Sequence, residues 1–467
     1  MTPMPLSRIA HWTGGRLRGD DVLVDALVTD TRTLDVGDGR AALFVALKGE
    51  RFDGHDHIAA AAALGARAAL VSLAIDAPLP QIVVADTERA LASLAAAMQH
   101  LRKTKVIAIT GSNGKTSVKT LLLSILRRAT QAGGDGAYAN PGNHNNEIGL
   151  PLAVIDAPDD ARYAIYEMGA GKPGDIAYLT GIARPDVALV NNIAPAHLER
   201  MGNLLGVADT KAAIYDALPA DGVAVINADD AFAPYFAERA HGRRLIRFGL
   251  DASADVDAKD VRLDGAHARF TLRTPQGSAD VVLPLPGRHN VANALAAASL
   301  AMAADIALDV ITAGLAAAAP VAGRLIAHEL DNGVLLIDDS YNANPGSLNA
   351  AIDTLAATGG ESWLVLGDMR ELGADAIALH AEAGRRAKAA GIARLYALGA
   401  LSAAAAESFG EGARHFDAHA RLADALRADL RRDARDGLRV LVKGSRGSAM
   451  DRVVDALLSG EGAAHAA

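Results

Sequence analysis

Residues 107–117 read Ile-Ala-Ile-Thr-Gly-Ser-Asn-Gly-Lys-Thr-Ser, which are the residue types of a phosphate-binding loop. Glycines let backbone N–H groups surround a polyphosphate, and a helix that begins here adds partial positive charge. In such a loop Lys115 reaches the β- and γ-phosphates of a nucleotide, and the Thr116 hydroxyl binds Mg²⁺. The segment therefore predicts nucleotide-binding residues at Gly111, Ser112, Asn113, Gly114, Lys115, Thr116 and Ser117.

The flanking sequence predicts the elements that position this loop. Residues 106–109 form an apolar run typical of a strand, and Val118, Leu121, Leu122 and Ile125 follow at helical spacing. A purely structural strand–turn–helix elbow is the alternative, but a strand before and a helix after favour nucleotide binding. The motif Gly-x-x-x-x-Gly-Lys-Thr would need glycine at position 109, where the chain has isoleucine.

Other candidate side chains come directly after apolar runs or within helix-like ones. Glu167 follows the run 162–166. Its carboxylate is either a hard oxygen ligand for Mg²⁺ or the partner of a surface lysine or arginine in an ion pair. His197 comes after the run 186–190, but a lone histidine is more often structural, and Mg²⁺ prefers oxygen. By local composition Lys211 is an ordinary exposed lysine of a helix.

Three further segments carry polar residues at predicted element ends. Asn290 and Asn293 share one face of a predicted helix, where they can contact a base edge, although Asn290 can also cap the helix. Residues 338–346, with two adjacent aspartates, suggest ribose, metal or amine recognition or a plain turn. Residues 443–446, Lys-Gly-Ser-Arg, suit a carboxylate or phosphate, or form a solvated basic loop.

Length and composition limit the class of protein. A chain of 467 residues is too long for one core, so two or three domains are expected. A net charge of −9 argues against non-specific nucleic-acid binding, and the absence of cysteine excludes disulfides and thiolate metal sites. Residues 1–15 lack the apolar region of a secretory signal, and the alanine-rich run 294–323 is interpreted as buried helices rather than a membrane span. We therefore expect a cytoplasmic protein.

The alternation of apolar runs with helix-like runs predicts an α/β protein of three domains. We expect a small N-terminal α/β domain at 1–102, a central parallel-sheet P-loop ATPase-like domain at 103–322, and a C-terminal Rossmann-like α/β domain at 323–467. Residues 262–273 and 277–285 alternate like an appended antiparallel hairpin. Open α/β sheets bind ligands beyond the carboxyl ends of their strands, so the polar clusters are expected to face a cleft, which can lie between two domains.

Taken together, several segments resemble the Mur ligase family of peptidoglycan precursor synthesis. The loop at 110–116 matches the family's shorter Gly-x-x-Gly-Lys pattern, which accounts for the isoleucine at position 109. Residues 140–149 resemble its substrate loop and residues 285–290 its adenine-side motif, and residues 29–32 and 46–55 resemble its UDP-sugar-binding segment. The segment 37–44 looks longer than the family's usual turn. Residues 367–373 and 441–446 are most similar to the members that add D-alanyl-D-alanine.

The resemblance implies an ATP- and Mg²⁺-dependent ligase that joins D-alanyl-D-alanine to UDP-N-acetylmuramoyl-tripeptide. It implies small-molecule substrates, no nucleic-acid or membrane partner, and a monomer. It identifies Lys211 with a lysine that the family carbamylates, His197 with a second-metal histidine, and Arg324 with the arginine that begins the third domain. The catalytic residues it implies are Lys115, His197, Lys211 and Arg324, and the metal ligands are Thr116, Glu167, His197 and Lys211.

The remaining site residues are assigned from the same matches. The nucleotide would also contact His289, Asn290, Asn293 and Asp339. The substrates would contact Thr31, Arg32, Lys48, Asn143, Asn146, Lys443, Ser445 and Arg446.

Two other functions remain open at this point. One is a different ligase of the superfamily, such as a diaminopimelate- or lysine-adding enzyme or folylpolyglutamate synthase, although the chain lacks the Asp-Asn-Pro-Arg expected of the diaminopimelate-adding relative. The other is a nucleotide-gated binding module without ligation, which would leave Glu167, His197 and Lys211 without a shared purpose. Whether the third residue of the acceptor peptide is diaminopimelate or lysine is also open.

Overall fold

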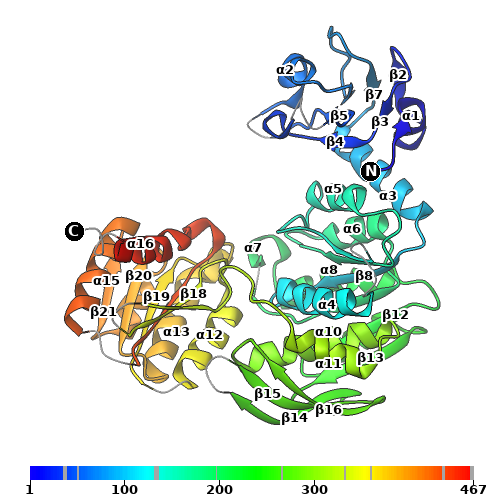
Figure 1. Cartoon of the computed structure of the whole chain (residues 1–467). Coiled ribbons are helices and arrows are strands. Elements are labelled where there is room, and N and C mark those ends of the chain that lie inside the picture. Colours follow the sequence, from blue (N-terminus) through cyan, green and yellow to red (C-terminus); the bar gives the residue numbers. More distant parts are fainter. Residues whose placement is uncertain are drawn as a thin grey trace.

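The structure is a computed structural model, and it describes residues 1–34, 39–49, 52–130, 136–195, 197–263, 267–330, 333–357, 360–433 and 437–462. Three α/β units follow one another along the chain (Figure 1). Part of the long turn expected at 37–44 lies outside the described residues, because 37 and 38 are not among them.

The first unit is built on a five-stranded sheet in the order β2-β7-β6-β5-β4, which is parallel except for the β2–β7 pair. A short antiparallel pair, β1–β3, lies beside it. Its strands are β1 (Met4–Pro5), β2 (Arg16–Arg18), β3 (Leu23–Val24), β4 (Ala26–Val28), β5 (Ala42–Val45), β6 (Ala68–Val71) and β7 (Gln81–Val83). Its helical segments are α1 (Leu6–Thr13), η1 (Thr31–Thr33), η2 (Gly54–His57) and α2 (Ile58–Ala63).

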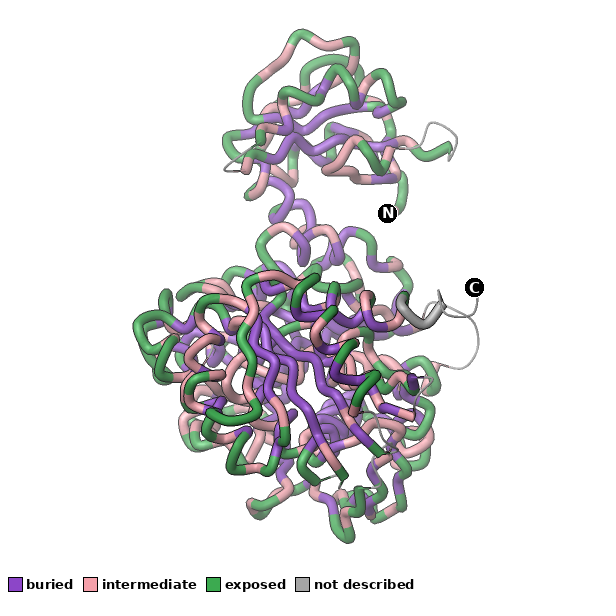
Figure 2. Tube along the Cα trace, turned by 90° about the vertical axis from the view of Figure 1, so that its left-hand side faces the viewer, coloured by how far each residue is buried: buried purple, intermediate pink, exposed green. Residues whose placement is uncertain are grey.

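Helix α3 (Thr87–Leu101) connects the first unit to the central one (Figures 1 and 2). Asp86 caps it by accepting hydrogen bonds from the backbone N–H groups of Glu88 and Arg89. The helix packs against α1 of the first unit and against α5 and α6 of the central unit. Its buried side chains belong to one apolar core shared by both units. The first unit is thus held to the central unit by a shared core.

The central unit contains a nine-stranded sheet in the order β16-β15-β14-β13-β12-β11-β8-β10-β9. The strands are parallel from β9 to β14, and β14–β15 and β15–β16 are antiparallel. They are β8 (Lys105–Thr110), β9 (Ala137–Ala139), β10 (Tyr163–Glu167), β11 (Val187–Val190), β12 (Val223–Asn227), β13 (Arg244–Gly249), β14 (Val256–Leu263), β15 (Ala268–Thr274) and β16 (Gly277–Leu283). The expected hairpin is β15–β16, but residues 262–263 belong to β14 and not to its first strand, because an alternating pattern does not mark where one strand ends and the next begins.

Helices cover both faces of this sheet. They are α4 (Lys115–Ala129), α5 (Gly149–Asp156), α6 (Asp175–Ala183), α7 (Leu198–Met201), α8 (Leu204–Asp216), α9 (Ala233–Arg239), α10 (Arg288–Ala303) and α11 (Leu308–Ala316). Nearly every residue of α10 is buried in a core that also contains α4, which confirms that the alanine-rich run 294–323 contributes buried helices. Among the described residues, no helix combines the length and apolar character needed to span a bilayer.

The third unit contains a six-stranded sheet in the order β17-β18-β22-β19-β20-β21, parallel except for the edge pair β17–β18. Its strands are β17 (Ile326–Glu329), β18 (Leu335–Asp339), β19 (Ser362–Gly367), β20 (Arg394–Leu398), β21 (Ala413–Phe416) and β22 (Arg439–Lys443). Its helical segments are α12 (Pro345–Ala357), η3 (Gly373–Asp375), α13 (Ala376–Ala389), α14 (Ala403–Phe409), α15 (His419–Asp433), η4 (Arg446–Ser448) and α16 (Asp451–Gly462).

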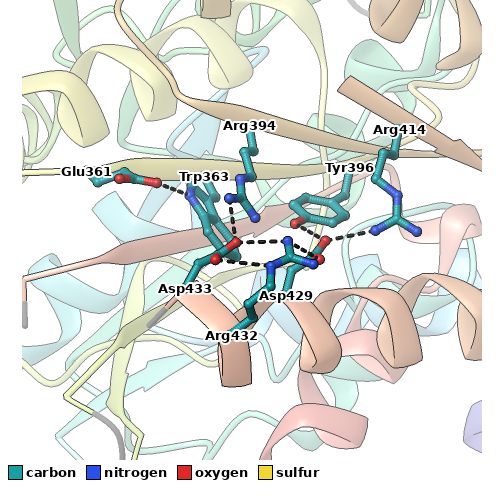
Figure 3. A network of polar contacts seen from close by, with 8 residues as sticks. All are labelled: Glu361, Trp363, Arg394, Tyr396, Arg414, Asp429, Arg432 and Asp433. Atoms are coloured by element: carbon teal, nitrogen blue, oxygen red, sulfur yellow. Dashed lines mark hydrogen bonds and ion pairs between the residues drawn. The ribbon is translucent and has the colours of Figure 1, made fainter. Parts of the chain in front are cut away.

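A polar network joins α15 to the sheet of this third unit (Figure 3). The buried Asp429 carboxylate accepts hydrogen bonds from the Tyr396 hydroxyl and from Arg414, each at 2.8 Å, and one from Arg432 at the same distance. The Tyr396 side chain is itself buried, so its hydroxyl depends on this acceptor. The network therefore fixes α15 on the sheet through Asp429, and a second carboxylate of the helix, that of Asp433, accepts from Arg394 of β20 at 2.5 Å.

Replacing Asp429 with alanine is expected to destabilise the third unit by about 1–3 kcal/mol, because the buried Tyr396 hydroxyl loses its acceptor. Urea unfolding followed by circular dichroism measures the change. Asp424→Ala is the matched control, since Asp424 lies on the same helix in an exposed ion pair with Arg427; its effect should stay below about 0.5 kcal/mol. Equal effects of the two substitutions would contradict the role of the network.

Candidate active site

A cavity of about 590 Å³ lies between the central and third units. It is lined by the phosphate-binding loop, by the carboxyl ends of β10 and β11, by residues directly before β17, and by the end of β18 with the segment after it. The predicted site residues that line it are Gly111, Ser112, Asn113, Gly114, Lys115, Thr116, Ser117, Asn146, Glu167, His197, Lys211, His289, Asn290, Asn293, Arg324, Asp339 and Lys443. Six predicted residues do not line it: Thr31, Arg32, Lys48, Asn143, Ser445 and Arg446.

The phosphate-binding loop is held between two neighbouring strand ends. Strand β8 lies between β10 and β11, so the loop leaves the middle of the sheet. Gly114 has a φ of 78°, and a Cβ there would lie 2.4 Å from the Asn293 amide oxygen and 2.5 Å from the Asn191 amide nitrogen. Only glycine fits this position, because both the backbone angle and the close contacts exclude a side chain.

Lys115 and Arg324 supply positive charge at this loop. The Lys115 ammonium donates a hydrogen bond to the Gly111 carbonyl at 2.7 Å. Burial lowers the pKa of Lys115, an effect that Glu167 opposes and Arg324 strengthens. Arg324 comes from the start of the third unit, and its guanidinium donates to the Thr116 hydroxyl at 3.0 Å. Its buried Nε has no hydrogen-bonding partner among the described residues, so a donor is available to an anion at this point.

Other contacts also connect the third unit to the loop. The Asn344 amide donates to the Asn113 side-chain oxygen at 2.8 Å. The guanidinium of Arg324 lies 4.5 Å above the ring of Tyr341. The third unit is thus seated on the phosphate-binding loop, with Arg324 between the two.

Glu167 lies beside the loop, because β10 pairs with β8 and places Glu167 opposite Ile109. Its carboxylate accepts hydrogen bonds from Thr116 and Asn145, both at 2.9 Å, and lies 3.3 Å from the Lys119 ammonium. Burial raises the pKa of Glu167, but Lys119, Lys115 and the hydrogen bonds outweigh that effect and hold the pKa below its usual value. The group is therefore an anion, and the interpretation as a surface ion pair is wrong.

Lys211 lies on α8 and is only 2% exposed. The interpretation as an ordinary exposed lysine is therefore wrong. Helix α8 contacts α6, α7, α9 and two strands, so its alanine-rich sequence did not distinguish an exposed face from a packed one. The pKa of Lys211 is lowered to about 7, mainly by burial and also by the nearby charge of Lys115. Asp175 acts in the opposite direction and raises the pKa. A substantial fraction of the amine is neutral near pH 7.

His197 occupies a left-handed backbone conformation, with a φ of 53°, just before α7. Burial lowers the pKa of His197, and the nearby positive charge of Lys211 lowers it further. The ion pair with Glu371 acts in the opposite direction and raises the pKa. Glu371 belongs to the third unit, so this contact also crosses between units. Sequence reasoning missed Glu371 as a partner, although it lies within the motif at 367–373.

The two asparagines of α10, Asn290 and Asn293, line the cavity, and Asn293 lies beside Gly114 of the phosphate-binding loop. The Asn290 amide donates to the Pro286 carbonyl at 2.7 Å, and no side chain caps the helix start, so the capping interpretation is wrong. Asn293 donates to Asn290 and accepts from Asn191, both at 3.2 Å. Burial lowers the pKa of the adjacent His289 to about 4, with a smaller effect from Lys443. This neutral, amide-rich wall suits an uncharged base.

In the third unit, the Lys443 ammonium lies 2.5 Å from Asp339 and 3.0 Å from the Asn342 carbonyl. Burial raises the pKa of Asp339, and Lys443 opposes the effect. The interpretation of residues 443–446 as a solvated basic loop is wrong for Lys443 and for Ser445, which are both buried. Ser445 donates to Ala343 and accepts from the backbone N–H of Arg370.

The remaining predicted substrate residues lie outside the cavity wall. Arg446 is exposed and forms an ion pair with Asp451 at 3.4 Å. In the first unit, Arg32 pairs with Asp30. Lys48 pairs there with Asp53 at 3.4 Å, and Thr31 begins the short segment η1. Asn143 lies in the loop after β9, and its carbonyl accepts from the backbone N–H of residue 145. Their roles as substrate contacts stay predictions.

Comparison with known proteins places these features in context. Three family profiles match the chain: "Mur ligase family, catalytic domain" at residues 36–99, "Mur ligase middle domain" at 109–301, and "Mur ligase, glutamate ligase domain" at 323–446. The chain is 44% identical to the UDP-N-acetylmuramoyl-tripeptide–D-alanyl-D-alanine ligase of Escherichia coli over 458 residues, 98% of this chain and 99% of that protein.

Solved structures are similar over the same length. A crystal structure of MurF from Acinetobacter baumannii matches with a TM-score of 0.92 and 34% identity, covering 98% of this chain and 99% of that one. MurF ligase from Thermotoga maritima in complex with ADP matches with a TM-score of 0.81 and 28% identity, covering 93% and 97%.

Proposed function

The chain belongs to the Mur ligase family, and we propose that it joins D-alanyl-D-alanine to UDP-N-acetylmuramoyl-tripeptide. The reaction uses ATP and yields UDP-N-acetylmuramoyl-pentapeptide, ADP and phosphate during peptidoglycan synthesis. Similarity over almost the whole length to ligases of this name supports the substrates. The observation that carries the chemistry is the cavity, where the phosphate-binding loop, Glu167, Lys211 and Arg324 meet.

The geometry supports an acyl-phosphate route. The acceptor carboxylate oxygen attacks the γ-phosphorus of ATP, the bond from that phosphorus to ADP breaks, and an acyl phosphate forms. The D-alanyl-D-alanine amine then attacks the acyl carbon, loses a proton, and displaces phosphate to leave a peptide bond. Lys115 and Arg324 lie where they can stabilise charge on the transferred phosphoryl group.

The residues present fit Mg²⁺ as a cofactor. The Thr116 hydroxyl and Glu167 carboxylate offer oxygen ligands 2.9 Å apart beside the loop. No group of three His, Cys, Asp or Glu that could hold a metal is found in the described part of the chain. We propose that Lys211, as a carbamate, supplies a further oxygen ligand and that His197 supplies a nitrogen ligand. Bound Mg²⁺ would neutralise charge on the nucleotide phosphates.

The three units would divide the substrates among them. We propose that residues 1–102 bind the UDP-sugar through Thr31, Arg32 and Lys48, that residues 103–322 bind ATP, and that residues 323–467 bind D-alanyl-D-alanine. Asn143 and Asn146 would contact the acceptor, and Lys443, Ser445 and Arg446 the dipeptide or the closed cavity. A cytoplasmic monomer is part of this proposal.

Phosphate release from ATP with different amine donors tests the proposed function. With UDP-N-acetylmuramoyl-tripeptide as acceptor, D-alanyl-D-alanine is expected to stimulate release at least about a hundredfold more than diaminopimelate, lysine or glutamate. Omitting the acceptor is the control. Stimulation by one of the other donors, with its matching acceptor, would identify a different ligase, and nucleotide binding without release would indicate a binding module.

A further inference from the structure

A second lysine of α4, Lys119, contacts Glu167 of the site without lining the cavity, and it has no role in the proposed chemistry. Lys119 is 5% exposed and follows Thr116 by three residues on the same face of the helix. Its ammonium donates to the carbonyls of Asn140 at 2.9 Å and Gly142 at 3.0 Å, and lies 3.3 Å from the Glu167 carboxylate. An ammonium has three N–H donors, so these three acceptors use its full capacity.

The two carbonyls belong to a loop that encloses the end of β10. The Asn140 side chain accepts from the backbone N–H of Glu167 at 2.8 Å and donates to the Glu167 carbonyl at 3.1 Å and to the His144 carbonyl at 2.7 Å. The Asn145 amide donates to the Glu167 carboxylate at 2.9 Å. These hydrogen bonds connect the loop to Glu167, and Lys119 connects both of them to α4.

The same loop forms a wall of the cavity through Asn145, Asn146 and Glu147. This wall belongs to the central unit, directly before α5. Helices α5 and α6 pack against α3, which also packs against α1 of the first unit (Figure 1). The third unit contributes a different part of the cavity lining, through Arg324, Asp339 and Lys443. An acceptor held by the first unit would therefore reach the cavity beside this wall.

We propose that Lys119 is a positioning residue for the acceptor: it holds the loop at 140–147 and the Glu167 carboxylate in register with the phosphate-binding loop. This inference rests on the proposed function for the identity of the acceptor. Its compact ammonium suits three converging oxygens, which the planar guanidinium of arginine does not. The donor dipeptide, if it binds from the third unit, does not depend on this contact.

Lys119→Met tests the inference, because methionine fills much of the same space without charge or donors. We expect the KM for UDP-N-acetylmuramoyl-tripeptide to rise about tenfold or more and the KM for D-alanyl-D-alanine to change less than about twofold. Hydrogen–deuterium exchange without substrates should show at least about tenfold faster exchange in residues 140–149 and unchanged exchange in β20.

Lys105→Met is the matched control, since Lys105 also pairs with a carboxylate, that of Asp305, but its ammonium bonds neither to Glu167 nor to the loop at 140–147. It should change neither KM nor exchange at 140–149. If Lys119→Met fails to fold, Lys119→Arg keeps a cation for Glu167 and is expected to show the same selective rise in the acceptor KM.

Three results would overturn the inference: equal rises in both KM values, a shift confined to the Mg²⁺ requirement, or a lower melting temperature with unchanged kinetics and exchange. The proposed function fails separately, if the wild-type protein shows no phosphate release that depends on D-alanyl-D-alanine. In that case the exchange experiment still decides whether Lys119 holds the loop, and unchanged exchange at 140–149 would refute it.

Discussion

Lys115→Ala is expected to lower kcat about a thousandfold or more while leaving the fold intact. The Lys115 side chain is half-buried at the amino end of α4, and its ammonium bonds to the Gly111 carbonyl of its own loop. That bond can be exchanged for a phosphate oxygen when ATP binds. Because phosphoryl transfer depends on positioning and charge stabilisation, losing this cation removes an interaction with the transition state.

Steady-state phosphate release measures this effect, and circular dichroism and thermal melting check the fold. Lys103→Ala is the control, because Lys103 is an exposed lysine just before β8 and does not line the cavity. It should retain wild-type turnover. Near-normal activity of Lys115→Ala would refute the assignment of residues 110–116 as the loop that binds the nucleotide phosphates.

Lys211→Ala should be nearly inactive and should regain part of its activity with acetate or formate. The pKa of Lys211 is lowered to about 7, so a neutral amine is available at neutral pH to attack CO₂. The amine nitrogen bonds to the carbon of CO₂, the electrons of one C=O π bond move to its oxygen, and the nitrogen releases one proton, which leaves a carbamate anion. In the alanine variant a short carboxylate can occupy the space and supply the same charge.

The measurement is turnover against carboxylate concentration, together with the dependence of wild-type activity on bicarbonate. Carbamylation should increase as the pH rises through 7, because the neutral amine is the reactive form. Lys259→Ala, which removes an exposed lysine of β14, should show neither loss nor rescue. Normal activity of Lys211→Ala, or loss without any rescue by carboxylates, would argue against the carbamate.

Local sequence signals were sufficient for the nucleotide side of the site. The apolar run before Gly111 forms β8, and Val118, Leu121, Leu122 and Ile125 are all buried on α4 as their spacing predicts. Both features depend on residues close in the chain, where periodicity and turn chemistry are informative. Strand order was not predictable in this way, yet it decides that Glu167 lies next to the loop.

Burial and long-range contacts account for what local patterns missed. Lys211 and Lys119 look like surface lysines, since each lies in a helix whose neighbours in space are far away in the chain. The resemblance identified Lys211 but not Lys119. Lys119 does share a helix face with Thr116, which is the signal that could have identified it. Glu371 contacts His197 only because the third unit is seated against the central unit.

In the proposed reaction, the γ-phosphoryl group of ATP is transferred to the acceptor carboxylate in the cavity, and this transfer activates the carboxylate. Acceptor labelled with ¹⁸O in its terminal carboxylate tests this claim most directly, with mass spectrometry of the released phosphate after a D-alanyl-D-alanine-dependent turnover. We expect each phosphate to carry one ¹⁸O atom from the acceptor, while the other ¹⁸O atom stays in the carbonyl of the new peptide bond. Unlabelled phosphate, or label recovered in AMP, would contradict it.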